Sequence, residues 1–288
     1  MLCPYYDKTC DSHELFSTCQ ISADAGYEAH LNRYDELYLD MTQITWEGGK
    51  QNFIDFIREK ITGELSQAYP ELKTDRAFTA TLANVVRMNG KPFIAIIDAW
   101  NSPIREIPGM EQPYLEFLRT TFKSSEPAST IFAAAYMTGI LPVAKDGKAS
   151  AVPDFKAHSV LGPDEFAGYV GFTEEEVKRL CEEKKTDFGK MKRWYEGYTV
   201  GNRHSIYNPY FVMHAARSGK FRSYWNKTWS AETLMTCMEM DRDDLQDTIA
   251  RLIAGERVVV DTESFQNDVE TLPCKDDVLT LLTHLWAI

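Results

Sequence analysis

Short apolar runs alternate with amphipathic stretches in the first half of the chain. Residues 93–97 (Phe-Ile-Ala-Ile-Ile) are too few for a helix and carry no polar side chain, which predicts a strand buried on both faces of a parallel sheet. Glu36–Met41 and Thr130–Thr138 are also strand-like. Because strands that alternate with helices pair in parallel through right-handed crossovers, this pattern predicts an α/β fold.

Three amphipathic segments accompany these runs. Apolar residues recur every three or four positions in residues 52–68, 79–88 and 114–122, which is the spacing of one helix face. Asn89-Gly90 is a turn signal that ends the second of these helices before the strand. Residues 1–143 are therefore predicted to form an α/β domain whose parallel sheet is flanked by helices.

The pattern changes in the second half of the chain. Residues 145–163 are rich in Gly, Ser, Asp and Pro, which predicts a loop that leaves the sheet. Thr173 and Glu176 have the spacing of a capping box at the start of a helix. A further helix is predicted to begin at Asp241, its cap, and to stop at Gly255, with Leu245, Ile249 and Leu252 on its apolar face. A short strand at Arg257–Asp261 and a last helix at Asp276–Leu285 follow it. Residues 144–288 are predicted to be a mainly helical domain.

Asp98 is the candidate for chemistry, because it ends the apolar strand. Open α/β sheets bind their ligands at the carboxyl ends of the strands. In phosphate-handling α/β proteins an acid at this place reaches the Mg²⁺ of a nucleotide, and a following Glu commonly activates water. Here Ala99 follows, and alanine can neither accept a proton nor orient water. Two interpretations remain: Asp98 still binds Mg²⁺-nucleotide, or it is a vestigial acid that caps a turn before Pro103.

Residues 190–229 combine many aromatic side chains with interleaved Lys and Arg. Trp194, Tyr195 and Tyr198 are at helical spacing, which favours a place in the core. Any exposed part of the block would be a partner-binding surface, because Trp, Tyr and Arg dominate such sites. RNA or DNA contact is plausible in this region alone. The candidate partner-binding residues are Arg193, Trp194, Tyr198, Arg203, Arg222 and Trp225.

Composition narrows the classes of function. The chain has 288 residues, 44% hydrophobic, and a net charge of −12, which disfavours nonspecific attraction to nucleic acid or to an anionic membrane. The longest apolar run, Ile131–Met137, is far too short to span a membrane, and no signal peptide begins the sequence. The six cysteines include no Cys-x-x-Cys pair and make no metal-ligand spacing with the histidines. We expect a soluble cytoplasmic protein with reduced thiols and no metal site.

Several short motifs follow one another in a specific order. They are Tyr-Tyr-Asp-Lys at 5–8, Ile-Ile-Asp at 96–98, Thr-Gly-Ile at 138–140, Gly-Phe-Thr-Glu-Glu-Glu-Val at 171–177, Lys-Arg-Trp-Tyr-Glu-Gly-Tyr at 192–198, Tyr-Asn-Pro at 207–209 and Tyr-Trp-Asn-Lys-Thr at 224–228. With these motifs nearly the whole chain resembles the bacterial AAA-ATPase-like proteins that are often fused to a C-terminal nuclease domain of the PD-(D/E)xK class. The resemblance implies a P-loop-NTPase-like parallel sheet.

The departures from this family pattern concern the catalytic parts. Typical members carry a P-loop just upstream of the segment matching Met1–Tyr6, so we expect this chain to begin after it. None of the five Gly-Lys dipeptides is followed by the Ser or Thr that binds Mg²⁺ in a P-loop. Family members usually have Asp-Glu-Tyr-Asp where this chain has Asp98-Ala99-Trp100-Asn101, so two of three acids are replaced.

The nuclease domain is also expected to be absent. The last residues, 274–288, resemble the run that precedes that domain in fused members. Pro153-Asp154 followed by Glu182-Glu183-Lys184 matches a nuclease motif in residue type, but the first pair is predicted in a loop and the second on a helix end. A nuclease needs its acids on adjacent strands around a metal, so we interpret this match as chance.

Two hypotheses for function follow. The first is a truncated or degenerate AAA-ATPase-like protein without ATPase activity and without a cofactor, which acts by binding a protein or nucleic-acid partner. The second is a nucleotide-dependent enzyme that uses Mg-ATP and whose phosphate loop comes from a partner or from residues outside this sequence. Because the P-loop strand is normally central, we also expect a gap between the strands that end near Met41, Asp98 and Thr138. Such a gap would be closed by the N-terminal segment, by self-association or by a partner's strand.

Overall fold

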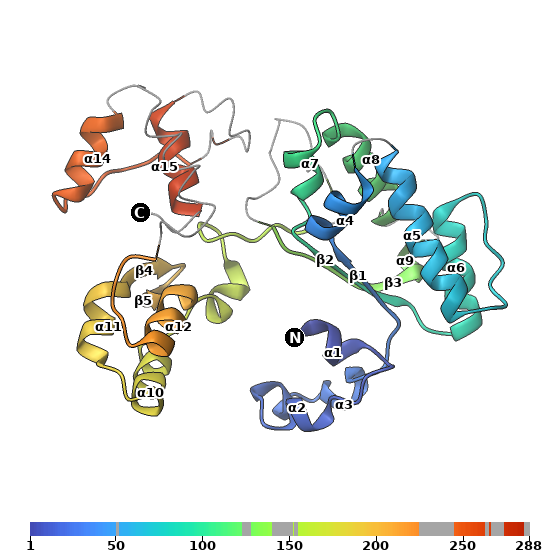
Figure 1. Ribbon diagram of the computed structural model, residues 1–288, viewed down its shortest axis with the longest axis horizontal. Coiled ribbons are helices and arrows are strands. Elements are labelled where there is room, and N and C mark those ends of the chain that lie inside the picture. Colours follow the sequence, from blue (N-terminus) through green and yellow to red (C-terminus); the bar gives the residue numbers. More distant parts are fainter. Residues whose placement is uncertain are drawn as a thin grey trace. The chain divides into compact units, whose positions relative to one another are not determined.

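The computed structural model describes most of the chain, in two compact units (Figure 1). Unit 1 comprises Met1–Ile140 and Lys148–Lys156, and unit 2 comprises Leu141–Gly147 and Ala157–Ile288. The described residues are 1–49, 52–122, 128–139, 152, 155–224, 245–262, 265 and 274–284. The predicted domain boundary at residue 143 lies outside them.

Unit 1 is an α/β unit, as its sequence pattern predicts. Its elements are α1 (Leu2–Tyr6), α2 (His13–Ser17), a 3₁₀ turn (Gln20–Ala23), α3 (Tyr27–His30), β1 (Glu36–Asp40), α4 (Met41–Gly48), α5 (Phe53–Ala68), α6 (Phe78–Asn89), β2 (Phe93–Asp98), α7 (Ser102–Glu106), α8 (Glu111–Phe122), α9 (Ala128–Ile131) and β3 (Phe132–Met137). The predicted strand at residues 93–97 is confirmed, with every side chain from Phe93 to Ile97 buried. Gly90, in the left-handed conformation, ends α6 where the turn signal predicts.

The three strands form one parallel sheet in the order β1-β2-β3. β2 pairs with β1 from Glu36↔Ile94 to Asp40↔Asp98, and with β3 from Phe93↔Phe132 to Ile97↔Met137. The predicted gap between these strands was therefore wrong, because β2 hydrogen-bonds directly to a neighbour on each side. The edges left open in the described residues are the outer edges of β1 and β3.

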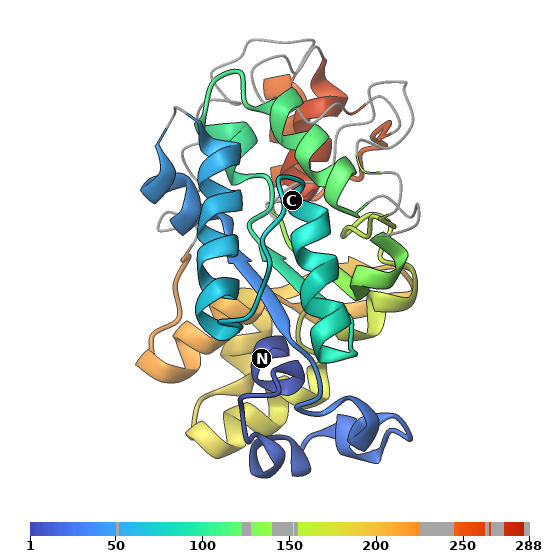
Figure 2. The same cartoon turned by 90° about the vertical axis from the view of Figure 1, so that its right-hand side faces the viewer.

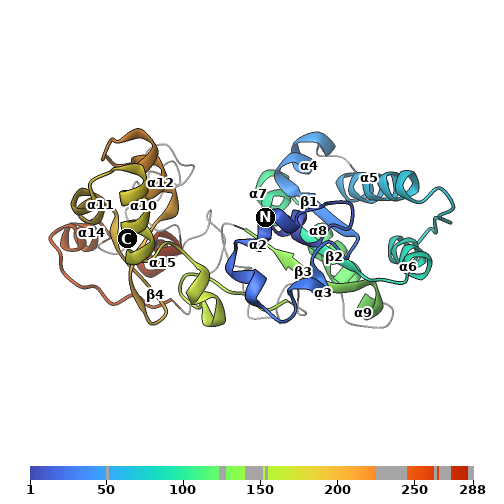
Figure 3. The same cartoon turned by 90° about the horizontal axis from the view of Figure 1, so that it is seen from below.

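Helices cover one face of this sheet much more fully than the other. Figures 1 and 2 show α5 and α6 side by side on the same face, and α5 also contacts α8. On the opposite face α1 contacts β1 and β2, and Figure 3 shows α1 across the strands from α5 and α6. Tyr38 and Tyr136 lie in register on either side of Ile96, and each is 47% exposed. The sheet therefore has one buried face and one partly open face.

The amino-terminal segment is tied to the base of the sheet by a polar network. The ammonium of Lys8 lies 2.8 Å from Asp35 Oδ1 and donates to the hydroxyl of Tyr69 at 2.8 Å. Tyr69 in turn donates to Asp35 Oδ2 at 2.6 Å, and the Asn89 carboxamide donates to the same oxygen. The network thus joins the residues after α1 to the start of β1, the end of α5 and the end of α6.

Unit 2 is mainly helical but contains a two-stranded hairpin. Its elements are a 3₁₀ turn (Asp164–Tyr169), α10 (Glu174–Lys184), α11 (Phe188–Tyr195), β4 (Glu196–Val200), β5 (Arg203–Tyr207), α12 (Pro209–Ser218), α14 (Leu245–Ile253) and α15 (Lys275–His284). The capping box of Thr173 and Glu176 is confirmed at the start of α10. Val177, Met191, Tyr207 and Val212, none of them exposed, are at the centre of the core formed by α10, α11, α12 and the hairpin.

Three sequence predictions in unit 2 need correction or lie outside the description. Residues 257–261 do not form a strand, because no described residue pairs with them. Trp194, Tyr195 and Tyr198 do not share a helix, because α11 ends at Tyr195 and β4 begins at Glu196. Asp241, the predicted cap, lies outside the described residues. In unit 1, Pro153 and Asp154 of the nuclease-like match also lie outside them.

No helix in the described ranges is long and apolar enough to cross a membrane.

Candidate functional site

Two carboxylates lie together at the carboxyl edge of the sheet in unit 1. Asp40 ends β1 and Asp98 ends β2, and the two residues are Cα partners in the parallel register. Asp98 is exposed to solvent, whereas the rest of β2 is buried. The predicted position of Asp98 at this edge is therefore confirmed, and a ligand of the sheet would meet both acids.

Asp98 is held by its own chain. One carboxylate oxygen, Oδ1, accepts a hydrogen bond from Ala99 N at 3.0 Å and another from the hydroxyl of Thr138, the residue that follows β3. The backbone of Thr138 closes the same edge, because its N–H donates to Ile97 O at 2.9 Å and its carbonyl accepts from Trp100 N at 2.8 Å. Thr138 is thus the residue that fixes Asp98, and sequence analysis assigned it no role beyond ending a strand.

The turn after Asp98 is strained and tightly packed. Ala99 has φ +51°, a left-handed conformation that costs a non-glycine residue about 1 kcal/mol or more. Trp100 is buried, and a Cβ added to Gly139 would lie 2.6 Å from two atoms of the Trp100 ring. Asn101 is also buried, and its Oδ1 has no hydrogen-bond partner among the described residues. The small residue at 139 and the turn at 99 therefore let Trp100 pack directly beneath the acid edge.

Asp40 also serves the local fold. Its Oδ1 accepts hydrogen bonds from Thr42 N at 3.0 Å and Gln43 N at 3.1 Å, which makes Asp40 the N-cap of α4. Burial, and then the negative charges of Asp98 and Asp40, raise the pKa of Tyr38 on the open face of the sheet. Both acids at the edge are therefore engaged with groups of unit 1.

Unit 2 carries a second candidate site, a row of touching aromatic rings. In order the row consists of Trp194, Tyr195, Tyr224, His214 and Tyr210. The ring centroids of successive members are 6.4, 6.3, 5.3 and 4.4 Å apart. Tyr195 and Tyr224 are buried, whereas Trp194 is 50% and Tyr210 is 40% exposed. This aromatic row therefore has a buried centre and two exposed ends.

The row borders an open hollow of about 390 Å³. Trp194, Tyr198, Phe211 and Tyr224 are among the residues that line it. The guanidinium of Arg222 lies 5.1 Å from the centroid of the Tyr224 ring, within the range of a cation–π contact. The hollow is large enough for a planar ring system of a small ligand.

The structure brings together only part of the predicted partner-binding set. Trp194 and Tyr198 line the same hollow, and Arg222 reaches it through Tyr224. Arg193 is exposed on α11, while Arg203 lies against Gly168. Trp225 lies outside the described residues. The expectation that Trp194 belongs to the core was wrong, because half of its surface is exposed. The same expectation is confirmed for Tyr195, which is 4% exposed.

Sequence analysis missed Tyr210, His214 and Tyr224 as members of the same site. Tyr210 and His214 are four residues apart on α12, so they share one helix face, which the sequence spacing could have indicated. The link to Tyr224 depends on tertiary structure. Tyr195 donates its hydroxyl proton to Arg222 O at 2.9 Å and accepts from Arg222 N at 3.0 Å, which brings residues 222–224 onto the row.

Comparison with known proteins bears on unit 1. The model of a family described as predicted AAA-ATPase (AAA-ATPase-like) matches residues 1–148, just over half of the chain. The chain belongs to this family. No curated protein and no solved structure matches it. The match ends at residue 148, before the main part of unit 2 begins at Ala157, so the aromatic row lies outside the part of the chain that the AAA-ATPase-like model covers.

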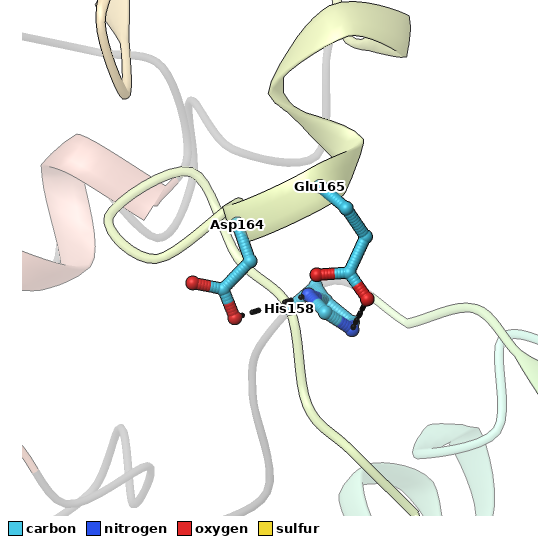
Figure 4. A group of neighbouring side chains, drawn as sticks. All are labelled: His158, Asp164 and Glu165. Atoms are coloured by element: carbon cyan, nitrogen blue, oxygen red, sulfur yellow. Dashed lines mark ion pairs between the residues drawn. The ribbon is translucent and has the colours of Figure 1, made fainter.

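A cluster of possible metal ligands in unit 2 does not have metal-site geometry. His158 lies beside Asp164 and Glu165, with Nδ1 3.6 Å from Asp164 Oδ2 and Nε2 4.0 Å from Glu165 Oε1 (Figure 4). A bound metal would be about 2.1 Å from each donor, so both carboxylates would have to converge on the lone pair of one ring nitrogen. Here each acid faces a different nitrogen, so the cluster is a pair of histidine–carboxylate contacts.

The charges of unit 2 are unevenly placed around the row. Lys192, on α11, donates to Glu174 Oε2 at 2.6 Å and lies 3.5 Å from Glu196, while Lys178 donates to Glu174 Oε1 at 2.6 Å. These hydrogen bonds from Lys178 and Lys192 lower the pKa of Glu174 to about 2. Glu174 and Glu196 are thus both paired with lysines, and Glu196 also lines the hollow beside Trp194.

The lowered pKa of Glu174 predicts acid sensitivity of unit 2. Its ionised form is stabilised in the folded state, so its contribution is complete above the ordinary pKa near 4.5 and is lost as the pH falls toward about 2. We expect Glu174→Gln to reduce the difference in melting temperature between pH 6 and pH 3. The control is Glu175→Gln at the neighbouring exposed acid. An equal pH dependence in both variants would contradict this assignment.

Proposed function

We propose that this AAA-ATPase-like chain acts by binding a macromolecular partner and does not hydrolyse ATP. The observation that carries the proposal is the state of the carboxyl edge. Asp98 accepts from Thr138 and Ala99, Asp40 caps α4, and the position after Asp98 is an alanine. Because oxygens of both carboxylates already accept hydrogen bonds from the chain itself, this edge binds a hydrated Mg²⁺ less well.

The absence of a general base at position 99 lowers the expected rate of ATP hydrolysis. General acid–base catalysis typically contributes about 10²-fold to 10⁴-fold to a rate, and Ala99 cannot supply it. A P-loop would be needed to hold phosphates by backbone N–H groups, and the 288 residues contain no Gly-Lys followed by Ser or Thr. The chain's own residues therefore support neither phosphate binding nor water activation.

The partner surface that we propose is the aromatic row with its hollow. Exposed Trp and Tyr beside Arg are the residue types that dominate binding sites. Trp194 and Tyr210 provide exposed rings, and Arg222 provides a cation over the ring of Tyr224 within the same row. A large ring that is half exposed over a hollow contributes less to stability than a buried one, which is consistent with a binding role.

One observation favours the second hypothesis, a nucleotide-dependent ATPase whose phosphate loop comes from elsewhere. The buried Oδ1 of Asn101, close to Gly139, has no hydrogen-bond partner in the described part of the chain. A buried acceptor without a donor lowers the stability of the folded state, and a hydrogen bond donated by a ligand would remove that cost. In this alternative Asp98 would hold Mg-ATP from the edge of the sheet.

A thermal-shift measurement with millimolar Mg-ATP distinguishes the partner-binding hypothesis from the ATPase hypothesis. A ligand at 100 times its dissociation constant adds about 2.7 kcal/mol to the free energy of unfolding, a rise of several degrees. We expect no rise for this chain. A rise that is present in the wild type and lost in Asp98→Ala would establish the alternative. Asp55→Ala, at an exposed acid on α5, controls for the loss of one charge.

A further inference from the structure

Positive charge is concentrated where the aromatic row lies. Residues 188–224 contain seven Lys or Arg and one acid, Glu196, a balance of +6 in a chain whose net charge is −12. The rest of the chain therefore carries −18. A basic segment of this kind in an acidic protein is the electrostatic footprint of an anionic partner.

Most of these cations are available to a ligand. Lys192 is taken up by Glu174 and Glu196, and Lys190 lies 3.9 Å from Asp187. The other five are exposed, and no carboxylate in the described residues forms an ion pair with any of them. They are Arg193, Arg203, Arg217, Lys220 and Arg222.

Two of these cations lie next to the aromatic row. Arg217 follows Tyr210 and His214 on α12 at positions i+7 and i+3, so it shares their exposed helix face. Arg222 lies over the ring of Tyr224. The backbone carbonyl of Lys220 accepts a hydrogen bond from the hydroxyl of Tyr224 at 2.7 Å. Arg217 and Arg222 thus lie beside rings of the row, while the charged residue among those that line the hollow is Glu196, which lies 3.5 Å from Lys192.

We infer that the aromatic row binds a single-stranded nucleic acid, with bases stacked on Trp194 and Tyr210 and phosphates paired with Arg217 and Arg222. This inference rests on the proposed function and names the class of partner. Every base has a π-face, so a row of rings beside a basic rim binds single strands with little sequence preference. An acidic peptide would use the cations but has no need of flat exposed rings, and a duplex hides its base faces within the stack.

The test is fluorescence anisotropy with labelled single strands of about 12 nucleotides, as DNA and as RNA. The comparison probes are a duplex of the same sequence, inorganic polyphosphate and polyglutamate. We expect both single strands to bind more tightly than the duplex and the two polyanions. Trp194→Ala should weaken single-strand binding about 10-fold, the usual effect of losing one stacked base. It should leave polyphosphate binding unchanged.

Matched variants separate the ring from the charge. Tyr169→Ala removes an aromatic ring that is 83% exposed but lies outside the row, and should have no effect. Arg222→Gln should weaken single-strand and polyphosphate binding alike and reduce the salt slope by about 0.7. Arg179→Gln, at an exposed cation on α10, is its control. Trp194→Phe keeps a ring and should restore most of the affinity.

The outcomes distinguish this inference from the proposed function. Equal binding of single strand and polyphosphate, with no effect of Trp194→Ala, would overturn the inference, because the surface would then be a simple anion exchanger. Tighter binding of polyglutamate than of either oligonucleotide would also overturn it and would leave partner binding in place. The proposed function fails by a different result, the Mg-ATP thermal shift that is lost in Asp98→Ala.

Discussion

Replacing Tyr195 with alanine should lower the free energy of unfolding of unit 2 by about 3–5 kcal/mol, the usual cost of removing a buried aromatic ring. The side chain is 4% exposed and packs against Phe211, Phe221 and Tyr224. Its hydroxyl also makes both hydrogen bonds to the backbone of Arg222. Urea denaturation followed by circular dichroism measures the loss.

The neighbouring Trp194→Ala is the matched comparison. Because half of Trp194 is exposed, we expect it to cost about 1–2 kcal/mol, although the ring is larger. Tyr195→Phe, which removes only the hydroxyl, should cost about 1–3 kcal/mol by leaving the N–H and C=O of Arg222 without this partner. A Trp194→Ala variant less stable than Tyr195→Ala would contradict the assignment of core and surface.

Replacing Lys8 with methionine should lower the free energy of unfolding of unit 1 by about 2–3 kcal/mol, because it leaves a partly buried carboxylate without its cation. Asp35 is 15% exposed, and among the described residues the side-chain donors that it would retain are Tyr69 and Asn89. The residues after α1 would lose the side-chain hydrogen bonds of Lys8 to Asp35, Tyr69 and Asn89. We expect the amides of residues 1–34 to exchange hydrogen faster in this variant.

Lys60→Met is the control for the lost charge. Lys60 pairs with Glu47 at 2.9 Å on the surface, and exposed pairs of this kind contribute about 0.2–1 kcal/mol. Equal destabilisation by Lys8→Met and Lys60→Met would show that the network around Asp35 is only a surface ion pair.

The sequence allowed the elements of unit 1 to be predicted but not their order in the sheet. β2 was recognisable because its apolar run is bounded by Pro92 and Asp98, and α6 because Gly90 ends it. Strand order depends on which backbones meet in space, and no local pattern records that. The prediction of a gap beside β2 was wrong for this reason. Self-association therefore loses the support that the gap would have given it. The outer edges of β1 and β3 are the open edges of this sheet in the described residues.

In unit 2 the sequence singled out the aromatic block but did not indicate which of its rings touch one another. Aromatic residues at 194, 195 and 198 have helical spacing, but the chain leaves the helix at Glu196, and Gly197 adopts φ +145°. Spacing then no longer decides which side chains share a face. The contact of Tyr224 with Tyr195 and His214 depends on how residues 219–224 return to α11, which is a tertiary effect.

At the carboxyl edge of the sheet, too, some features could be predicted from the sequence and others could not. Asp98 could be placed from its position at the end of an apolar run, and Ala99 could be recognised as an absent base. The hydrogen bond from Thr138 could not, because residues 98 and 138 meet only through the pairing of β2 with β3. The left-handed φ of Ala99 was equally hidden, since alanine gives no sequence signal for it.

Phosphate release from ATP in the presence of Mg²⁺ tests the central claim most directly, measured side by side for the wild-type chain and Asp98→Asn. The account predicts a rate indistinguishable from buffer for both proteins, because position 99 has no base and Asp98 is engaged by Thr138. Turnover in the wild type that requires Mg²⁺ and disappears in Asp98→Asn would contradict it and would make this chain an active ATPase.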